Sequence, residues 1–124
     1  MKNEFITYEQ AVKLKELGFD KECIAWYSDG KLQIDGLGIK PNHYRAHHGV
    51  LAPLYQQVFK WFMDRHKLYG IIIPTINMYW TFKIMTVTQD MVEIPPYKEV
   101  DSIDYNLYES AELACLKKLI EIVK

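Results

Sequence analysis

The sequence predicts an α+β domain, with an antiparallel sheet of about four strands and helices packed on one face of it. Three observations lead to this fold class. Apolar residues recur at helical spacing in three segments, and period-two alternation recurs in short runs between those segments. The connections within each pair of runs are too short for parallel crossovers, so the strands should pair as hairpins. The predicted order is α-β-β-α-β-β-α, and 124 residues fit a single domain over 1–124.

The first predicted element is a helix over residues 8–17. Thr7 and, three residues later, Gln10 form the pattern of a capping box, in which side chains satisfy backbone N–H groups at the helix start. Gly18 suits the position just after the helix end, because glycine adopts a left-handed backbone conformation without strain.

A hairpin is predicted next, with strands over 22–28 and 31–35. Asp29-Gly30 lies between them and is typical of a two-residue type I′ turn. The segment 36–51 is predicted to be an irregular loop, because glycines, Pro41 and an asparagine interrupt it. The alternation predicts one apolar face formed by Ile24, Trp26, Leu32 and Ile34.

The middle of the chain predicts a helix and a second hairpin. Pro53 suits the first helical position, where its missing N–H costs nothing, and Gly70 is interpreted as the break after the helix. Strands are predicted over 71–75 and 79–88, and Pro74 favours an edge position or a strand end. The predicted buried arc of the helix consists of Leu54, Tyr55, Val58, Phe59, Trp61 and Phe62.

The C-terminal part predicts a loop and a last helix. Residues 89–105 contain two adjacent prolines and an acidic excess, which indicates a surface loop. Asn106 with Glu109 forms a second capping-box pattern, and the helix should then run to about Val123. Its apolar arc is wide enough to be covered on more than one side.

Composition indicates a soluble protein of the cytoplasm. The formal net charge is −1, so the general basic excess of a phosphate-binding surface is missing. Cys23 and Cys115 lie among apolar residues inside predicted regular elements, which favours buried, reduced thiols. No apolar run is long enough for a signal peptide or a membrane span, and no membrane partner is predicted.

Three features also carry a family resemblance: Gly18-Phe19-Asp20 after a short helix, Ala52-Pro53 with Trp61 ahead of an apolar hairpin, and the segment from Tyr108-Glu109 to Lys124. By these features, which span most of the chain, it resembles small uncharacterised proteins encoded in phage and prophage genomes, many from gut bacteria. The resemblance implies a phage or prophage origin and a location in the cytoplasm of a bacterial host. It implies no catalytic or binding residue, because the family has no assigned activity.

Three histidines in the predicted loop suggest a metal site. If residues 43–47 were helical, His43 and His47 would share a face, and His48 lies beside them. Asp35 or His66 could supply a further ligand. The alternative is a polar loop that happens to be rich in histidine, which the neighbouring glycines and proline favour.

Aromatic and basic residues suggest binding surfaces of two kinds. Tyr27 and Tyr79 are predicted on the strand faces opposite Trp26 and Trp80, where they could contact a protein or the stacked bases of a single strand, or else serve as ordinary half-buried sheet residues. Tyr44, Arg45, His47 and His48, with Lys40 nearby, form the candidate nucleic-acid surface.

The leading functional hypothesis is a small non-enzymatic accessory protein that binds another protein or itself, with a homodimer through a face carrying Tyr27, Tyr79, Met85 and Val87. Nucleic-acid binding is the alternative, and a metal-dependent enzyme using the histidine loop is the third hypothesis. No serine lies in a nucleophile motif and no glycine loop suits a phosphate, so no catalytic residue and no cofactor are predicted.

Overall fold

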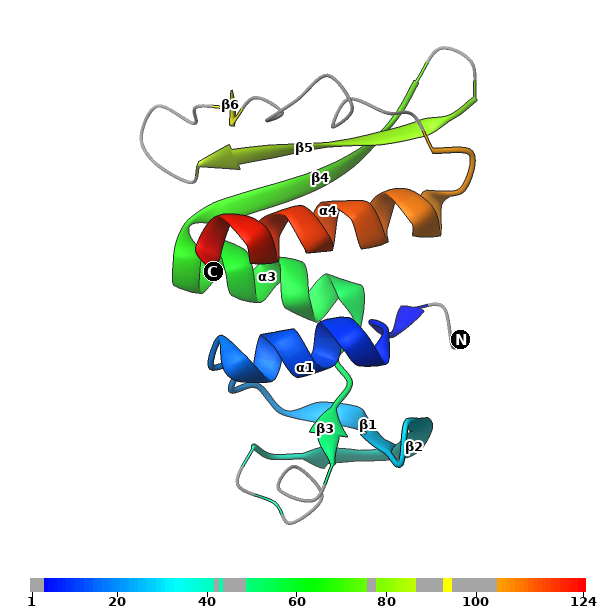
Figure 1. Cartoon of the computed structure of the whole chain (residues 1–124), viewed down its shortest axis with the longest axis vertical. Coiled ribbons are helices and arrows are strands. Elements are labelled where there is room, and N and C mark those ends of the chain that lie inside the picture. Colours follow the sequence, from blue (N-terminus) through cyan, green and yellow to red (C-terminus); the bar gives the residue numbers. More distant parts are fainter. Residues whose placement is uncertain (1–3, 42, 44–48, 76–77, 87–92, 95–104) are drawn as a thin grey trace. The chain divides into compact units, whose positions relative to one another are not determined.

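The computed structural model describes residues 4–41, 43, 49–75, 78–86, 93–94 and 105–124. It confirms the predicted α+β class and the predicted order, to which two short strands are added (Figure 1). The chain divides into two compact units, residues 1–58 and 59–124, and the prediction of one domain over 1–124 stays a prediction. The elements are α1 (Tyr8–Glu16), β1 (Cys23–Ser28), β2 (Lys31–Ile39), β3 (Val50–Leu51), α3 (Tyr55–His66), β4 (Leu68–Pro74), β5 (Trp80–Thr86), β6 (Glu93–Ile94) and α4 (Tyr108–Val123).

The strands pair antiparallel, as predicted, but they are divided between two sheets. One three-stranded sheet has the order β2-β1-β3 and the other has the order β4-β5-β6. Each predicted hairpin thus forms the body of a sheet, and a two-residue strand extends it on the far side of β1 or β5. Such short strands carry too few residues to show a period-two pattern in the sequence.

Helix α1 begins and ends as its sequence predicts. The Thr7 hydroxyl accepts from the backbone N–H of Gln10 at 3.4 Å. At the other end Gly18 has φ +91°, the N–H of Phe19 donates to the Leu14 carbonyl and the N–H of Gly18 donates to the Lys15 carbonyl. This pair of bonds is a Schellman motif, which satisfies two of the last carbonyls and turns the chain back along the helix.

The register of the first hairpin corrects the predicted apolar face. Asp29 and Gly30 both have positive φ, as a type I′ turn requires, and Ser28 pairs with Lys31. Next to a two-residue turn, the two residue numbers of each cross-strand pair add up to an odd number. Even-numbered residues of β1 there therefore lie opposite odd-numbered residues of β2. Leu32 therefore shares its face with Tyr27, and Ile34 lies opposite Ala25, instead of both joining Ile24 and Trp26.

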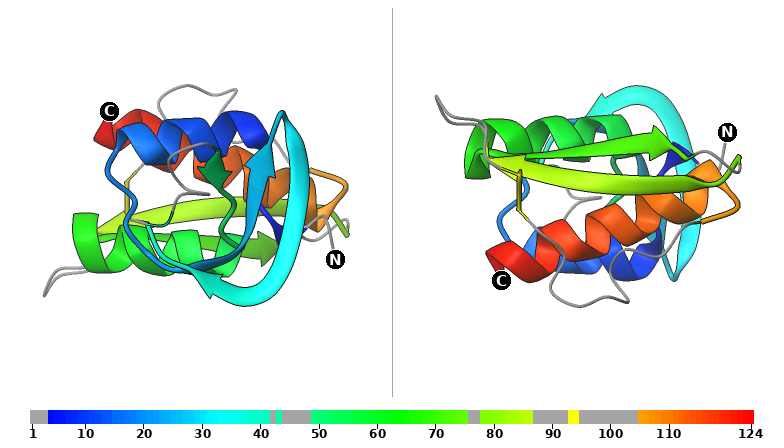
Figure 2. Two further views of the ribbon diagram at one scale, coloured as in Figure 1. Left: turned by 90° about the horizontal axis from the view of Figure 1, so that it is seen from below. Right: turned by 90° about the horizontal axis from the view of Figure 1, so that it is seen from above.

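The prediction that residues 36–51 are wholly irregular is wrong at both ends of that segment. Strand β2 continues through Gly36 and Gly38 to Ile39, and Val50–Leu51 form β3. Between the Ala25–Ile34 and Cys23–Ile39 pairs, β2 holds extra residues, so it bends around β1 (Figure 2). The glycines occur in this irregular part of an edge strand, where they permit a bulge instead of ending the strand.

The core of the first unit lies between the sheet and the segment before α1. Phe5, Ala25 and Ala52 are buried together, and Ile24, Tyr27, Leu32 and Leu54 pack against them. Backbone bonds hold the segment in place, because the Ile6 N–H donates to the Pro53 carbonyl at 3.1 Å and Phe5 forms a bridge with Leu54.

Helix α3 begins two residues later than predicted and ends earlier than Gly70. Leu54 precedes its first turn, and the Gln57 side chain accepts from the Leu54 N–H at 3.1 Å. Pro53 is therefore outside the helix, and its carbonyl accepts a hydrogen bond from the backbone N–H of Ile6. The helix ends at His66, and Lys67 takes a positive φ of 57° before β4 begins. The buried arc is confirmed: Tyr55, Val58, Trp61 and Phe62 are buried, and Leu54 and Phe59 are half-buried.

Gly70 is inside strand β4 and marks a close approach of α4, instead of a break. A Cβ placed on Gly70 would lie 2.7 Å from the Cys115 Sγ and 3.3 Å from the Leu119 Cδ1, and its third neighbour is Phe59. Helix α4 and the last part of α3 therefore cover the same face of the β4–β5 pair, which Figure 1 also shows. Within this unit the helices lie on one face of the sheet, as predicted.

Two local predictions near α4 are corrected. Residues 89–105 are not a loop throughout, because Glu93–Ile94 pair with β5 and Tyr105 exchanges two backbone hydrogen bonds of 2.6 Å with Trp80. The second capping box is absent: Leu107 is the residue before the helix, and its side chain makes no cap bond. The helix end at Val123 is confirmed. In the described part of the chain, no helix combines the length and apolarity needed to cross a bilayer.

Candidate functional site

The register of β4 and β5 sorts their side chains onto two faces. Gly70 lies opposite Ile84, which is buried on the helix side, and Trp80 on that face meets Tyr108 of α4 edge to face at 5.0 Å. Directly opposed residues share a face and successive residues alternate, so the odd-numbered positions point the other way. We call this the outer face, and it consists of the cross-strand pairs Tyr69–Met85, Ile71–Lys83 and Ile73–Thr81.

The outer face is mostly apolar and partly exposed. The Tyr69 side chain is 37% exposed, Lys83 is exposed, and the other four members are half-buried. The period-two alternation predicted for the strands is thus confirmed in β5, where Thr81, Lys83 and Met85 lie on the face opposite Trp80. The strands run side by side over this length (Figure 2), with seven consecutive residue pairs and no register shift.

Tyr79 lies just before the first residue of β5. Its side chain is 43% exposed, and its carbonyl accepts from the Thr75 N–H at 2.7 Å, which closes the end of the hairpin. Met78 beside it is 90% exposed and has a positive φ of 63°. Val87, which we also expected on this surface, is outside the described residues.

Tyr27 has a different environment. Its hydroxyl donates to the Ile6 carbonyl at 2.7 Å, its ring meets Tyr8 edge to face at 5.5 Å, and its body packs on the core of the first unit. Burial raises the pKa of Tyr27 above its ordinary value of 10.0. These contacts are those of an ordinary half-buried sheet residue, and not of a side chain that is open to a partner.

Most of the histidine segment lies outside the described residues. These are Tyr44, Arg45, His47 and His48, so the metal and nucleic-acid hypotheses stay predictions. His43 is half-buried, and its backbone N–H donates to the Lys40 carbonyl at 2.9 Å. His66, the proposed extra ligand, packs against the rings of both Trp61 and Phe62, with ring centroids 5.0 and 5.6 Å away, and burial lowers its pKa. Among the residues that are described, no three His, Cys, Asp or Glu side chains gather as metal ligands would.

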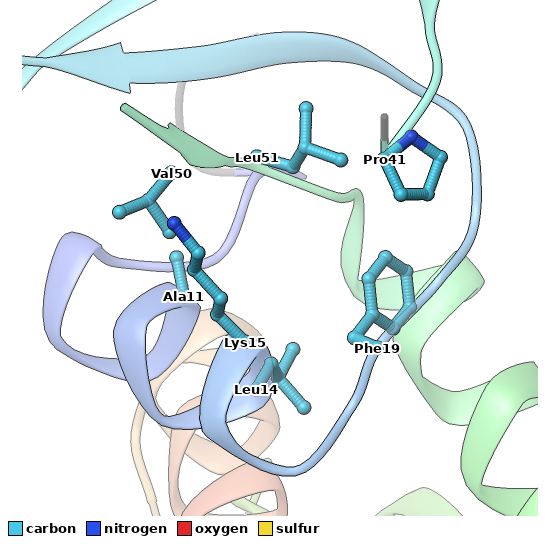
Figure 3. A pocket seen from close by; sticks show the side chains of 7 residues that line it. All are labelled: Ala11, Leu14, Lys15, Phe19, Pro41, Val50 and Leu51. Carbon is cyan, nitrogen blue, oxygen red and sulfur yellow. The ribbon is translucent and has the colours of Figure 1, made fainter. Parts of the chain in front are cut away.

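A small cavity lies in the first unit, between α1 and β3 (Figure 3). Its volume is about 140 Å³, and α1 supplies three of the side chains around it. The Schellman motif turns Phe19 back beside Leu14, the contact that commonly accompanies this helix end. The cavity is lined by Ala11, Leu14, Lys15, Phe19, Pro41, Val50 and Leu51.

No family model, curated protein or solved structure matches this chain. The outer face, the cavity and the reactive groups of the chain itself are therefore the features that bear on its function.

The two cysteines are buried and unpaired with each other, as predicted. Burial, with Glu22 nearby, raises the pKa of the Cys23 thiol to about 12, and burial, with Glu112 nearby, raises the pKa of the Cys115 thiol above its ordinary value. Since the thiolate is the reactive form, both groups are poor nucleophiles at neutral pH.

The sequence prediction missed part of each candidate surface. Tyr69, Ile71 and Ile73 were not assigned to the outer face, although successive residues of a strand alternate between its two faces, so every second residue of β4 must lie there. The cavity residues come from four separate segments, and only the Gly18-Phe19 helix end gave a local signal for one of them.

Proposed function

We propose that the protein is a non-enzymatic interaction module that forms a homodimer through the outer face of the β4–β5 pair. The observation that carries this proposal is the set of three cross-strand pairs, Tyr69–Met85, Ile71–Lys83 and Ile73–Thr81, on the face opposite α4. Four of these six side chains are large and apolar, and they stand next to one another on a regular two-strand surface. Contiguous apolar side chains on a surface favour protein contact.

A second copy of the chain is the occupant we propose for this face. A two-fold dimer needs only one self-complementary patch, and a regularly paired two-strand surface can pack against its own copy at the usual spacing between sheets, about 10 Å. Lys83 is compatible with such an interface, because the stem of a lysine can cover apolar surface while its ammonium reaches water at the rim. Tyr69 is aromatic, and aromatic residues are enriched at the centres of protein–protein interfaces.

The resemblance to phage and prophage proteins supports an accessory role in the cytoplasm of a bacterial host, and we propose this as the biological setting. The buried, protonated thiols suit a reducing compartment.

The test is the association state of the Tyr69→Lys/Met85→Lys double variant. These two residues face each other across the strands, so the change puts four extra positive charges into a two-fold interface and leaves the helix-facing side of the sheet unaltered. We expect sedimentation equilibrium to give a dimer for the parent at micromolar concentration and a folded monomer for the double variant.

Ile34→Lys is the matched control, because Ile34 is also an apolar strand residue, is 47% exposed and belongs to the other unit. This control should remain dimeric. A parent that sediments as a monomer at 100 µM, about the upper limit of weak specific association, would contradict self-association. A double variant that remains dimeric would contradict the choice of surface.

A further inference from the structure

The cavity of the first unit has an apolar body and one charged side chain at its rim. Six of its seven lining side chains are apolar, and they come from α1, the helix end, Pro41 in the segment after β2, and strand β3. Figure 3 shows Phe19 and Pro41 on one side of the space and Lys15 on the other, where it extends toward Val50; Leu14 lies at the base of Lys15 and Leu51 closes the top.

Lys15 supplies the single charge among the described lining residues. Its Nζ donates to the Gly49 carbonyl at 3.3 Å, which holds the ammonium beside the first residue of β3. Lys15 is exposed, whereas Ala11 and Leu14 on the same helix are buried. The ammonium is therefore at the rim, in contact with water, and the alkyl stem runs along the apolar space.

The volume limits what can enter. About 140 Å³ is too small for a nucleotide or another ligand of drug size, which typically needs several hundred Å³. An apolar cavity of about 150 Å³ is known to accept a benzene ring. One aromatic ring or one branched aliphatic group therefore fits the space.

We propose that this cavity is a binding site for a small monocarboxylate with a compact apolar body, either an aromatic or a branched aliphatic acid. The body enters the space between Leu14, Phe19 and Leu51, and the carboxylate remains at the rim as an acceptor for the Lys15 ammonium. A phosphate group suits the site less well, because phosphate sites usually combine several N–H donors or an arginine. This proposal does not rest on the homodimer, which involves the other unit.

The experiment titrates the full chain with phenylacetate, with its neutral analogue phenylacetamide and with acetate. Binding is followed by the amide NMR shifts of Ala11, Leu14 and Val50. We expect saturable binding of phenylacetate, binding of phenylacetamide about tenfold weaker because the charged hydrogen bond is lost, and no saturation by acetate. Equal affinities for phenylacetate and phenylacetamide in the parent would overturn the proposal, as would the absence of saturable binding.

Two variants separate the charge from the cavity. Lys15→Met keeps the length of the stem and removes the ammonium, so the preference for phenylacetate over phenylacetamide should fall from about tenfold to about one. Val50→Phe adds a ring at the cavity wall and should abolish binding of both compounds. Leu51→Phe provides a second filling variant if Val50→Phe unfolds. A preference that survives in Lys15→Met, or binding that survives in a folded filling variant, would contradict the assignment.

The ligand proposal and the homodimer proposal can be contradicted independently of each other. The dimer test changes Tyr69 and Met85 and measures mass, whereas the cavity test changes Lys15 and Val50 and measures ligand affinity. The Tyr69→Lys/Met85→Lys variant should therefore bind phenylacetate with the affinity of the parent.

Discussion

The two units use the same parts, a three-stranded antiparallel sheet with a helix packed beside it, but the helix approaches the strands differently. In the second unit Gly70 has no side chain, so the Cys115 Sγ and Leu119 of α4 lie directly against the β4 backbone. In the first unit α1 packs beside the two-residue strand β3, and the side chains there leave a cavity of about 140 Å³. The missing side chain at Gly70 thus lets α4 lie close to the sheet, whereas the side chains between α1 and β3 leave space.

The strands themselves show a related difference. β4 and β5 pair through seven consecutive residues, which gives a regular surface on the side away from α4. β1 and β2 lose their register between Ala25 and Cys23, and β2 bends there. A regular pair offers a continuous face to a partner, which is why we propose protein contact for the second unit. The ligand proposal for the first unit depends instead on the space between α1 and β3.

Gly70→Ala should give the largest effect on stability. The new Cβ would meet the Cys115 Sγ at 2.7 Å, a distance that real Cβ atoms do not tolerate, so α4 or the strand must shift. Overpacking of this kind typically costs about 1–3 kcal/mol. Chemical denaturation should therefore show a lower midpoint with an unchanged slope.

The double variant Gly70→Ala/Cys115→Ala sharpens this prediction, because it removes the sulfur that the new Cβ would meet. The cost of Gly70→Ala should be smaller in the Cys115→Ala background, with a favourable coupling of about 1 kcal/mol, within the range usual for residues in contact. Additive effects would mean that Gly70 does not set the distance between α4 and β4.

Gly18→Ala should give a moderate effect in the first unit. Gly18 has φ +91° and open space around it, so the penalty is backbone strain alone, about 1 kcal/mol. Gly38→Ala is the matched control: its Cβ would meet only the end of the exposed Glu22 side chain, which can turn away. We expect thermal unfolding to show a clear loss for Gly18→Ala and almost none for Gly38→Ala. The reverse order would place the essential glycine in the bulge of β2.

The smallest effect concerns the pH dependence of the second unit. Burial, with Arg65 beside it, lowers the pKa of His66 below its ordinary value of 6.5. As the pH falls below 6.5, the unfolded chain binds a proton at this site more readily than the folded chain. The contribution of neutral His66 to stability is therefore complete above pH 6.5 and is lost as the pH falls toward the lower folded pKa.

The measurement compares the parent with His66→Gln, which removes the imidazole at this position. Denaturation at a series of pH values from about 8 to 5, across the ordinary range of histidine, should show a steeper acid loss for the parent. Parallel pH profiles would indicate that the His66 ring titrates equally in the folded and unfolded states.

Several features of the fold are determined by residues close together in sequence. Thr7 and Gly18 fix the two ends of α1, and Asp29-Gly30 fixes a two-residue turn. The spacing of apolar residues predicts the buried sides of α3 and α4, including Trp61, which is 2% exposed. Each of these signals depends on one turn or one periodic face, so no distant residue is needed to read it.

The remaining features depend on which segments meet, and the tertiary structure decided them. The strand register places Leu32 opposite Tyr27, although simple alternation had grouped it with Trp26. The chain leaves α3 through a positive φ at Lys67, and not at Gly70 as predicted. Gly70 is needed because of Cys115, which is 45 positions further along the chain. The outer face and the cavity combine residues from two strands and from four segments. Sequence periodicity specifies which side of an element is apolar, but the identity of the segment that covers that side is set by packing over the whole unit.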